Sequence, residues 1–315
     1  MKTYIIGHIK PDTDAVIATL AFKHLFDSMD CWNHPNSVAC ITHNLNPETQ
    51  FIFKKFNQTP LQLIKASDIQ PKDKIVLVDH NETSQMLAKI NPNQITDIFD
   101  HHKINLKLSQ PIFLTMKAWG STCTIAHNLM KTHKVSIPKK LAALMLCAIV
   151  SDTVGFKSST TTEVDKNAAS KLAKISDIKN IKNLTLEIFK AKSDISTLTN
   201  EKIITNDYKI YNFSNKKVFI SQLETVEQEN LLKNKVSDLL SALTKAKKDQ
   251  NLDLAFLVIS DIIKVNSKIL ILSNQEKQIA EKAFNKKVSN NILDIGPKLS
   301  RKKDIAPAIE KAILS

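Results

Sequence analysis

The sequence predicts an α/β protein with two domains that share a cleft: an N-terminal domain built on a parallel sheet, and a smaller C-terminal domain with a mixed sheet and helices. Three observations predict it. Short apolar runs alternate with helix-like stretches through the first half, which is typical of a parallel sheet covered on both faces. The chain has 315 residues, about twice a typical domain. Its periodicity lapses into a polar stretch around residues 190–196.

The elements follow in chain order. In the first half, β-branched or aromatic runs predict strands at 4–6, 38–41, 75–78 and 95–99, and helical patterns occupy 15–26, 60–64, 121–131, 138–150, 163–173 and 184–189. Beyond the polar stretch, strands are expected at 208–213, 218–223, 255–259 and 269–272, with helices at 229–247, 276–284 and 305–313. The predicted domains are therefore 1–189 and 197–315, with 190–196 as the hinge.

Composition restricts the class of protein without identifying it. Hydrophobic residues make up 43% and charged residues 24%, as in ordinary globular proteins. No apolar run is long enough to span a bilayer and no signal-peptide pattern opens the chain, so we expect a cytoplasmic protein without a membrane partner. The four cysteines lack ligand spacing and are expected to be free, mostly buried thiols. The net charge of +13 permits an anionic ligand but does not identify one.

Polar groups follow the first predicted strand, where His8, Asp12 and Asp14 occupy the loop before a helix. Ligands of open parallel sheets bind where strands end and helices begin. An aspartate there could equally be a helix N-cap, and taken alone that interpretation would be preferred.

Three further apolar segments also end in carboxylates or imidazoles. Asp79 and His80 follow 75–78, Asp100, His101 and His102 follow 95–99, and Asp152 ends the apolar stretch 141–150. Grouping these carboxylates is costly unless a cation neutralises them. Their number suggests two ions, and oxygen plus imidazole ligands without thiolate fit Mn²⁺ or Mg²⁺ and tolerate Co²⁺. His80 and Asp100 could instead orient the ligands.

These segments together resemble the DHH phosphoesterase superfamily: His8-x-x-Pro-Asp12-x-Asp14, then Asp79-His80-Asn81, Asp100-His101-His102 and Ser151-Asp152-Thr153. The late run Ser300-Arg301-Lys302-Lys303 is similar to its family II inorganic pyrophosphatase branch. Gly120-Ser121-Thr122 and Phe156-Lys157-Ser158 also match, so the resemblance spans nearly the whole chain in the right order.

The resemblance implies a role for each matching residue. His8 and Asp12 would bind the first metal, Asp14, His101 and Asp152 the second, and Asp79 would bridge them. The residues predicted to bind substrate are His102, Lys209, Arg301 and Lys302, and those predicted to act in catalysis are His102, Asp14 and Asp152, while Lys303 would face outward. The implied reaction is hydrolysis of pyrophosphate to two phosphates by in-line attack of a metal-bridging hydroxide.

The resemblance also implies cofactors, partners and motion. Two Mn²⁺ per subunit are expected, with Co²⁺ as a substitute and Mg²⁺ accompanying the substrate, in a homodimer formed through the N-terminal domain. Because metals would sit on one domain and basic residues on the other, the active site would lie in the cleft and closure about the hinge would assemble it.

Some features depart from the family pattern, and rival functions remain. Asp304 stands where the family usually has glutamine, Ser159 replaces a common proline and Cys123 a common alanine. A short-chain polyphosphatase is the nearest rival. A nuclease or cyclic-dinucleotide phosphodiesterase would usually carry a late glycine- and histidine-rich motif, which is missing. A non-enzymatic nucleic-acid binder is disfavoured by the metal-ligand set and by 6% aromatic residues with little interleaving among the lysines.

Overall fold

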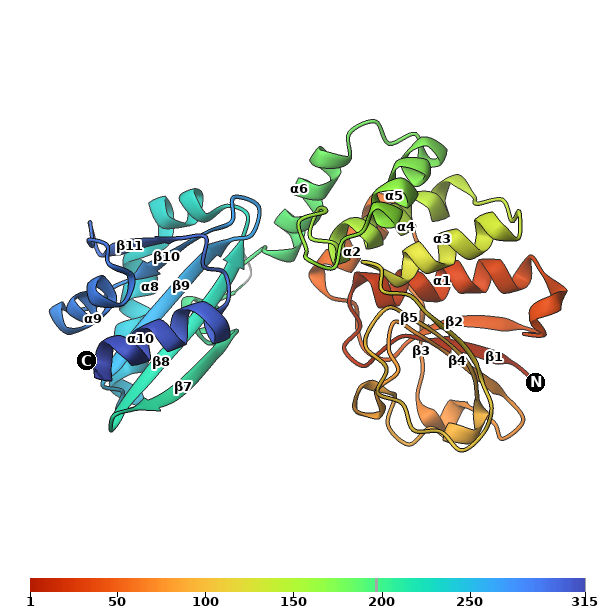
Figure 1. Ribbon diagram of the computed structural model, residues 1–315, viewed down its shortest axis with the longest axis horizontal. Helices are drawn as coiled ribbons and strands as arrows, with labels where there is room; N and C mark the ends of the chain where they lie inside the picture. Colours follow the sequence, from red (N-terminus) through yellow and green to blue (C-terminus); the bar gives the residue numbers. More distant parts are fainter. Residues whose placement is uncertain (196–197, 315) are drawn as a thin grey trace. The chain divides into compact units, whose positions relative to one another are not determined.

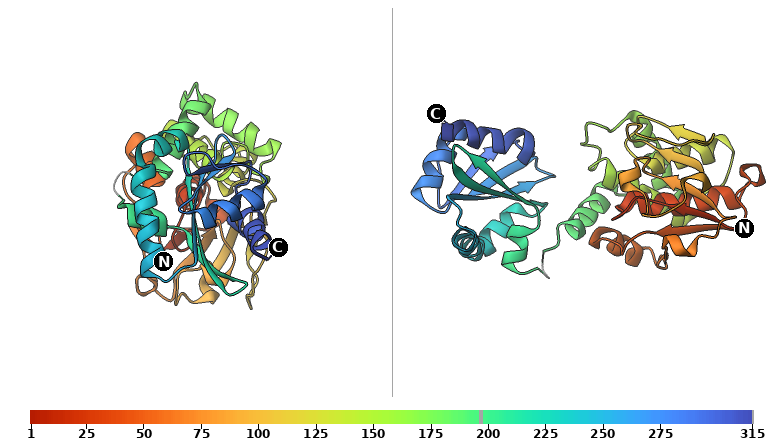
Figure 2. Two further views of the ribbon diagram at one scale, coloured as in Figure 1. Left: turned by 90° about the vertical axis from the view of Figure 1, so that its left-hand side faces the viewer. Right: turned by 90° about the horizontal axis from the view of Figure 1, so that it is seen from below.

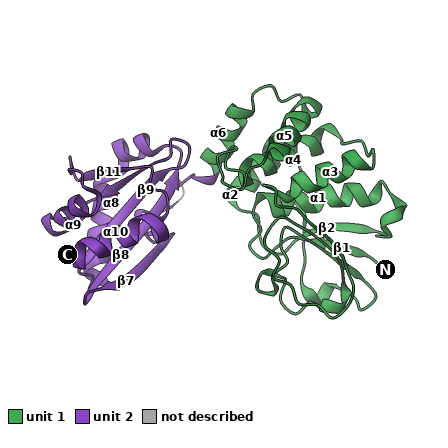
Figure 3. Ribbon diagram, viewed as in Figure 1, with its two compact units in different colours: residues 1–191 green, residues 192–315 purple. Residues whose placement is uncertain are grey.

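The chain folds into two compact units, residues 1–191 and 192–315 (Figure 3). The computed structural model describes residues 1–195 and 198–314. The division falls inside the stretch 190–196, of which Ser196 lies outside the described residues, as does Thr197, the first residue of the predicted C-terminal domain.

The first unit contains a six-stranded sheet in the order β3-β2-β1-β4-β5-β6, in which every neighbouring pair is parallel. This confirms the predicted parallel sheet. Its central strands are the apolar runs recognised in the sequence, and they are buried on both faces, as parallel strands usually are. The strands are β1 (Thr3–Ile6), β2 (Ser37–Ile41), β3 (Gln62–Leu63), β4 (Lys74–Val78), β5 (Ile95–Asp100) and β6 (Phe113–Met116).

Long helices cover one face of this sheet, and loops with short 3₁₀ turns cover the other (Figure 1). Helix α4 is buried from Leu141 to Ser151 because α1, α3 and α5 surround it. Such a helix is apolar all round and reaches the interior with its last residue, Asp152. The helices are α1 (Thr13–Asp27), α2 (Pro47–Lys55), α3 (Thr122–Thr132), α4 (Lys139–Asp152), α5 (Glu163–Ser176) and α6 (Ile181–Lys192).

The prediction of a helix at 60–64 was wrong. Gln62 and Leu63 form the edge strand β3, paired in parallel with Cys40 and Ile41. Five residues are too few for a stable helix. The backbone N–H and C=O groups of this segment form hydrogen bonds with β2 instead. Two elements were missed: the exposed edge strand β6, and α2, although its Asn46 cap and Pro47 are recognisable start signals.

The second unit is a five-stranded mixed sheet, as predicted, in the order β11-β10-β9-β8-β7. Only β8 and β9 are parallel among its pairs within the described residues. Helices α7 and α8 pack on one face and α9 and α10 on the other (Figure 2, right). Its elements are α7 (Asn200–Thr205), β7 (Tyr208–Phe213), β8 (Lys216–Thr225), α8 (Gln228–Asp249), β9 (Leu254–Asp261), β10 (Asn266–Leu270), α9 (Asn274–Phe284), β11 (Ile292–Gly296) and α10 (Ala306–Leu314). Strand β11 and helix α7 were not predicted.

Two expectations from composition can be compared with the structure. The four cysteines are free thiols, and Cys31 is the exposed one. Among the helices of the described ranges, none is long and apolar enough to cross a membrane.

Candidate metal centre

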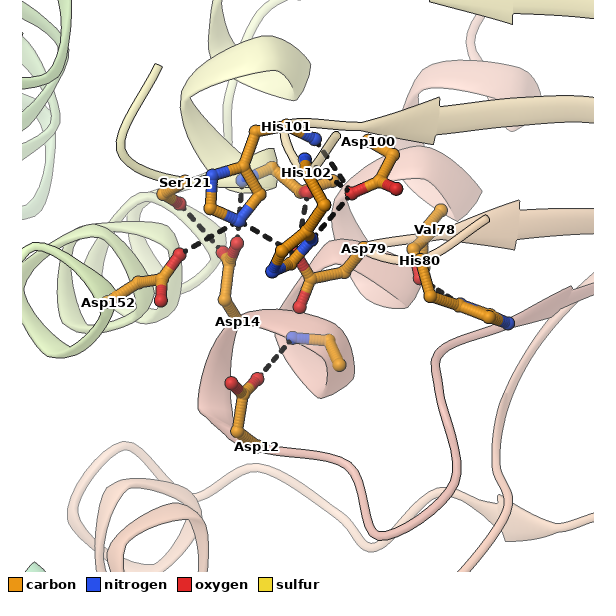
Figure 4. Close-up of polar contacts among 12 residues, drawn as sticks. Asp12, Asp14, Val78, Asp79, His80, Asp100, His101, His102, Ser121 and Asp152 are labelled. Atoms are coloured by element: carbon orange, nitrogen blue, oxygen red, sulfur yellow. Dashed lines mark hydrogen bonds and ion pairs between the residues drawn. The ribbon is translucent and has the colours of Figure 1, made fainter. Parts of the chain in front are cut away.

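Acidic and imidazole side chains from separate parts of the first unit converge at the carboxyl ends of its central strands (Figure 4). His8 follows β1, Asp79 follows β4 and His101 follows β5. The right-handed crossovers of a parallel sheet bring these strand ends to one edge. Asp14 arrives on the first turn of α1 and Asp152 on the last turn of α4.

Asp79 lies at the centre of the cluster. One of its carboxylate oxygens is 3.8 Å from His8 Nε2, and the other is 3.3 Å from His101 Nε2. Its backbone is left-handed, with φ of 63°, a conformation that aspartate tolerates better than most residues. The turn directly follows β4, and the side chain of Asp79, which is 2% exposed, faces the other ligand candidates.

The six side chains fall into two groups that share Asp79. One group contains His8, Asp12 and Asp79, and the other Asp14, Asp79, His101 and Asp152; within each, one potential ligand atom per residue lies within 4.8 Å of the others. The groups divide the residues in the same way as the resemblance does, while their role as metal ligands stays a prediction. Asp12 also caps α1, accepting a hydrogen bond from Ala15 N at 3.0 Å.

The histidine tautomers suit a cation. His101 donates from Nδ1 to the Trp119 carbonyl at 2.9 Å, and His8 donates from Nδ1 to the Ile9 carbonyl at 2.9 Å. When it is neutral, as a metal ligand has to be, an imidazole fixed in this way turns the lone pair of Nε2 toward the carboxylates. His101 Nε2 and Asp152 Oδ2 lie 3.2 Å apart, both buried and without a hydrogen-bond partner among the described residues. Polar atoms left in this state fit a bound divalent cation.

The electrostatics also favour a cation. Burial, and then the charge of Asp14, raises the pKa of Asp152 to about 9, while burial and Asp79 raise that of Asp14 to about 7. Burial alone would lower the pKa of His101, yet Asp79, Asp152 and Asp14 raise it to about 11. Carboxylates that retain protons and an imidazole held as a cation indicate excess negative charge.

No thiolate contributes to this charge. Burial raises the pKa of the Cys123 thiol far above its usual range, so the sulfur beside Asp14 stays protonated. The donor set is thus oxygen and imidazole nitrogen, which suits manganese or magnesium better than structural zinc.

The start of α3 holds the carboxylates in place. Ser121 Oγ and Thr122 N donate to Asp14 at 2.7 and 2.6 Å, and Thr122 Oγ1 donates to Asp79 at 2.9 Å. In the sequence, Ser121 and Thr122 were recognised only as part of a run that matches the family, and no role was predicted for them. A serine before a helix is a visible cap signal, but nothing local says that the helix end faces a carboxylate more than 100 residues away.

His102 is held beside the cluster and faces solvent. Its Nδ1 donates to Asp100 Oδ1 at 2.8 Å, and this bond raises the pKa of the ring although burial opposes it. Asn81 donates to the other oxygen of Asp100 at 2.6 Å and accepts from Asn105 N at 2.6 Å, so it fixes the loop after His102. His80 donates from Nδ1 to the Val78 carbonyl at 2.9 Å (Figure 4), and its ring lies edge-on to that of His8 with the ring centroids 6.3 Å apart.

The basic candidates belong to the second unit. Arg301 forms an ion pair with Asp207 Oδ1 at 2.8 Å and donates to the Asp207 carbonyl at 2.8 Å. These contacts fix the guanidinium beside Asp207, which precedes Lys209 by two residues in the sequence. Gln222 supports the preceding turn by accepting from Arg301 N at 3.2 Å. Lys209 and Lys302 are exposed. The run Arg301–Ile305 forms a π-helical turn, a geometry often found at functional sites.

Asp304 has a structural partner. Its carboxylate accepts from Ser300 N at 3.0 Å while Ser300 Oγ accepts from Lys303 N at 3.1 Å, the reciprocal pattern of a capping box. The carboxylate that departs from the family pattern therefore turns back to the chain.

Asp304→Ala is expected to destabilise the second unit by about 1 kcal/mol, the usual loss for a helix cap. Chemical denaturation would measure it, with Asp304→Gln as the control that keeps an acceptor and retains most of the stability. Unchanged stability of the alanine variant would contradict the capping role.

Comparisons with known proteins cover nearly the whole chain. Residues 2–149 match the model of the DHH family N-terminal domain, and residues 186–312 match that of the DHHA2 domain. A manganese-dependent inorganic pyrophosphatase from Methanocaldococcus jannaschii is 37% identical, with 98% of each chain covered, and one from Bacillus subtilis is 34% identical, with 99% of each covered.

Solved structures agree with these matches. A Methanococcus jannaschii protein assigned to the family II inorganic pyrophosphatases superposes with a TM-score of 0.63 at 35% identity, covering 99% of this chain and 100% of that one. An exopolyphosphatase-related protein from Bacteroides fragilis gives a TM-score of 0.53 at 17% identity, covering 99% of this chain and 92% of that one, and shows a shared fold alone.

Proposed function

Because the chain belongs to the family of manganese-dependent inorganic pyrophosphatases, we propose that it hydrolyses pyrophosphate to two phosphates with divalent cations held by its first unit. The observation that carries the proposal is the convergence of six ligand candidates in two groups that share Asp79. His8 and Asp12 would hold one cation, Asp14, His101 and Asp152 would hold the other, and Asp79 would serve both groups. Cations bound there would supply Lewis acidity and lower the pKa of a water molecule.

His102 acts on the substrate side of the centre. Its Nδ1 is tied to Asp100, so its Nε2 is left to contact a phosphate or to carry a proton to the leaving phosphate. Asp100 fixes the ring orientation, and Asn81 in turn fixes Asp100. The side chain of His102 is 52% exposed, which leaves it accessible to a substrate.

The second unit supplies the positive charge that pyrophosphate requires. Arg301 presents a planar guanidinium held by Asp207, and a planar fork matches phosphate oxygens in geometry as well as charge. Lys209 and Lys302 add flexible point charges. Residues 190–196 act as the hinge between the two parts.

The finer features of the proposal follow from the family. Each subunit holds two Mn²⁺, Co²⁺ can substitute, and Mg²⁺ accompanies the substrate. The protein is a cytoplasmic homodimer formed through its N-terminal domain and binds neither nucleic acid nor membrane.

Metal-stripped protein reloaded with Mn²⁺, Mg²⁺, Co²⁺ or Zn²⁺ would test the function, with phosphate release measured from pyrophosphate, tripolyphosphate and a nucleotide ester. We expect Mn²⁺ to restore cleavage of pyrophosphate most strongly. Preference for tripolyphosphate would reassign the chain to the polyphosphatases, and cleavage of the ester to the nucleotide phosphodiesterases. Inactivity on every substrate would refute an enzymatic role.

Lys302→Ala is expected to lower kcat/KM for pyrophosphate by about 10- to 100-fold, since a hydrogen bond to a charged group contributes roughly 1.5–3 kcal/mol. Its manganese content should stay unchanged, because Lys302 belongs to the unit without the metal ligands. Steady-state kinetics and metal analysis would measure both. The neighbouring exposed Lys303→Ala is the matched control and should remain close to wild type. Loss of metal together with activity in Lys302→Ala would show that the roles are assigned wrongly.

A further inference from the structure

We propose that Asp165 is a positioning residue for the metal centre and acts through the backbone of Gly120. The inference rests on the proposed function, because the ligand roles of Asp14, Asp79 and His101 belong to that function. Asp165 lies outside the cluster and outside every run that identified the family in the sequence.

Asp165 is a fully buried carboxylate on the first turn of α5, with 0% of its surface exposed. Its Oδ2 accepts from Gly120 N at 2.9 Å, and its Oδ1 accepts from Thr124 Oγ1 at 2.7 Å. Both partners belong to the start of α3, 45 and 41 residues earlier in the chain. A buried charge is tolerated only when donors surround it, and two of the donors here come from outside its own helix and its cap.

A local role for Asp165 is also present and has to be separated from the proposed one. Its Oδ2 accepts from Thr162 N at 2.8 Å while the Thr162 side chain accepts from the backbone N–H of Asp165, which together form the capping box of α5, and Thr162 Oγ1 also donates to Oδ2 at 2.6 Å. A capping box needs only the two bonds to backbone N–H groups. The bonds to Gly120 and Thr124 add nothing to the cap, so they point to a second role in fixing the segment before α3.

That segment supplies partners to three of the proposed ligands. The residue before Gly120 is Trp119, whose carbonyl accepts from His101 Nδ1 at 2.9 Å. The residues after it are Ser121 and Thr122, which donate to Asp14 and Asp79. A single buried anchor at Gly120 therefore sets the backbone from which His101, Asp14 and Asp79 are oriented.

The approach of the two segments is too close for any side chain at Gly120. A Cβ atom there would lie 2.6 Å from Thr153 Cγ2 and 3.0 Å from Asp165 Oδ2. Contacts under 3.0 Å do not occur between such atoms, so only glycine fits. Thr153 directly follows Asp152, and the same packing thus joins the Gly120 segment to the end of α4 that carries the fourth ligand candidate of this group.

Removal of the Asp165 carboxylate would leave the N–H of Gly120 buried without an acceptor. The segment would then shift to find one, and the ligand partners on either side of Gly120 would move with it. Loss of a group that orients metal ligands typically weakens metal binding by about 10- to 100-fold, and we expect that range for Asp165→Ala.

The test is Mn²⁺ binding to the metal-free full chain, measured by titration calorimetry and by the electron paramagnetic resonance spectrum of the bound ion, with the thermal midpoint recorded in parallel. The matched control is Asp73→Ala. Asp73 is also buried and accepts from two backbone N–H groups, Lys2 N at 2.8 Å and Gln70 N at 3.0 Å, but it lies at the opposite end of the same sheet. Both variants should lose thermal stability, whereas only Asp165→Ala should bind Mn²⁺ more weakly and with an altered spectrum.

Each outcome decides the matter. If Asp165→Ala binds Mn²⁺ as tightly as the wild type does, the positioning role is overturned and the proposed function stands. No Mn²⁺ binding by the wild type would overturn both. If Asp165→Ala does not fold, Asp165→Asn takes its place: a neutral oxygen would replace the charged acceptor, whose bonds are roughly twice as strong, so binding should weaken by about a few-fold. Unchanged binding by that variant would refute the proposal.

Discussion

Asp79→Asn is expected to abolish manganese binding at the centre. Asp79 is the one side chain shared by both groups, so its loss affects both cations. Activity should fall at least about 1,000-fold, more than the roughly 10- to 100-fold that follows loss of a group which only orients a ligand. Asparagine keeps the shape, accepts from Thr122 Oγ1 in the same way and tolerates the left-handed backbone.

The effect of this substitution on the metal-free protein has two opposing parts. The charge of Asp79 raises the pKa of both Asp14 and Asp152, next in effect to burial for Asp14 and to burial and Asp14 for Asp152. The same carboxylate raises the pKa of His101 against the effect of burial, so its loss removes a favourable contact together with the repulsion.

The matched control for this substitution is Asp97→Asn on β5. Asp97 is buried and lies 3.1 Å from His34 Nε2, away from the ligand candidates. We expect it to lower the thermal midpoint and to leave Mn²⁺ affinity intact, in contrast to Asp79→Asn, which should lose that affinity. Calorimetry and thermal unfolding without metal would decide. Full Mn²⁺ affinity in Asp79→Asn would contradict its place as the bridging ligand.

The metal-free protein is expected to lose stability as the pH rises from about 6 to 8.5, while the stabilisation by Mn²⁺ grows. Burial and Asp14 raise the pKa of Asp152 from 3.8 to about 9, so the folded chain holds a proton there that the unfolded chain has lost. For His101, burial opposes protonation, but the neighbouring aspartates raise the pKa from 6.5 to about 11. Between the unfolded and folded values, each proton that the folded pair holds in excess of the unfolded chain lowers the free energy of unfolding by about 1.4 kcal/mol per pH unit.

Mn²⁺ reverses this dependence because it binds the deprotonated groups and displaces their protons. Thermal unfolding across the pH range, with and without saturating Mn²⁺, measures both trends. Asp152→Asn is the control, since an amide does not titrate and should flatten the metal-free profile. A metal-free midpoint that rises with pH would refute the electrostatic account of the cluster.

The fold was predictable where one segment carries its own signal. Runs such as Ile75–Val78 are apolar, β-branched and followed by polar residues, and they became central strands. Edge elements gave weaker signals. Gln62 and Leu63 form a strand because β2 offers a free edge, and Phe113–Met116 forms one beside β5. Neither pairing can be predicted from the residues of the segment itself.

The candidate site was likewise predictable only in part. Its ligand candidates could be found because each follows a buried element, and parallel strands end at one edge. The groups that hold them could not. The pairing of Arg301 with Asp207 spans 94 residues, and that of Asp165 with Gly120 spans 45. Such contacts depend on how the chain is folded, and Thr162-x-x-Asp165 read locally predicts a helix cap and nothing more.

The two groups of ligand candidates differ in their exposure to solvent, so ions bound to them are expected to exchange at different rates. The side chain of Asp12 is 52% exposed, whereas Asp14 is 1% exposed and bonded to the start of α3. An ion among His8, Asp12 and Asp79 can therefore exchange with the surroundings by the swing of one surface carboxylate. An ion among Asp14, His101 and Asp152 would have no ligand as exposed as Asp12, because Asp152 is 24% exposed and His101 8%. Loading and dialysis should accordingly proceed in two kinetic phases, with the outer ion entering last and leaving first.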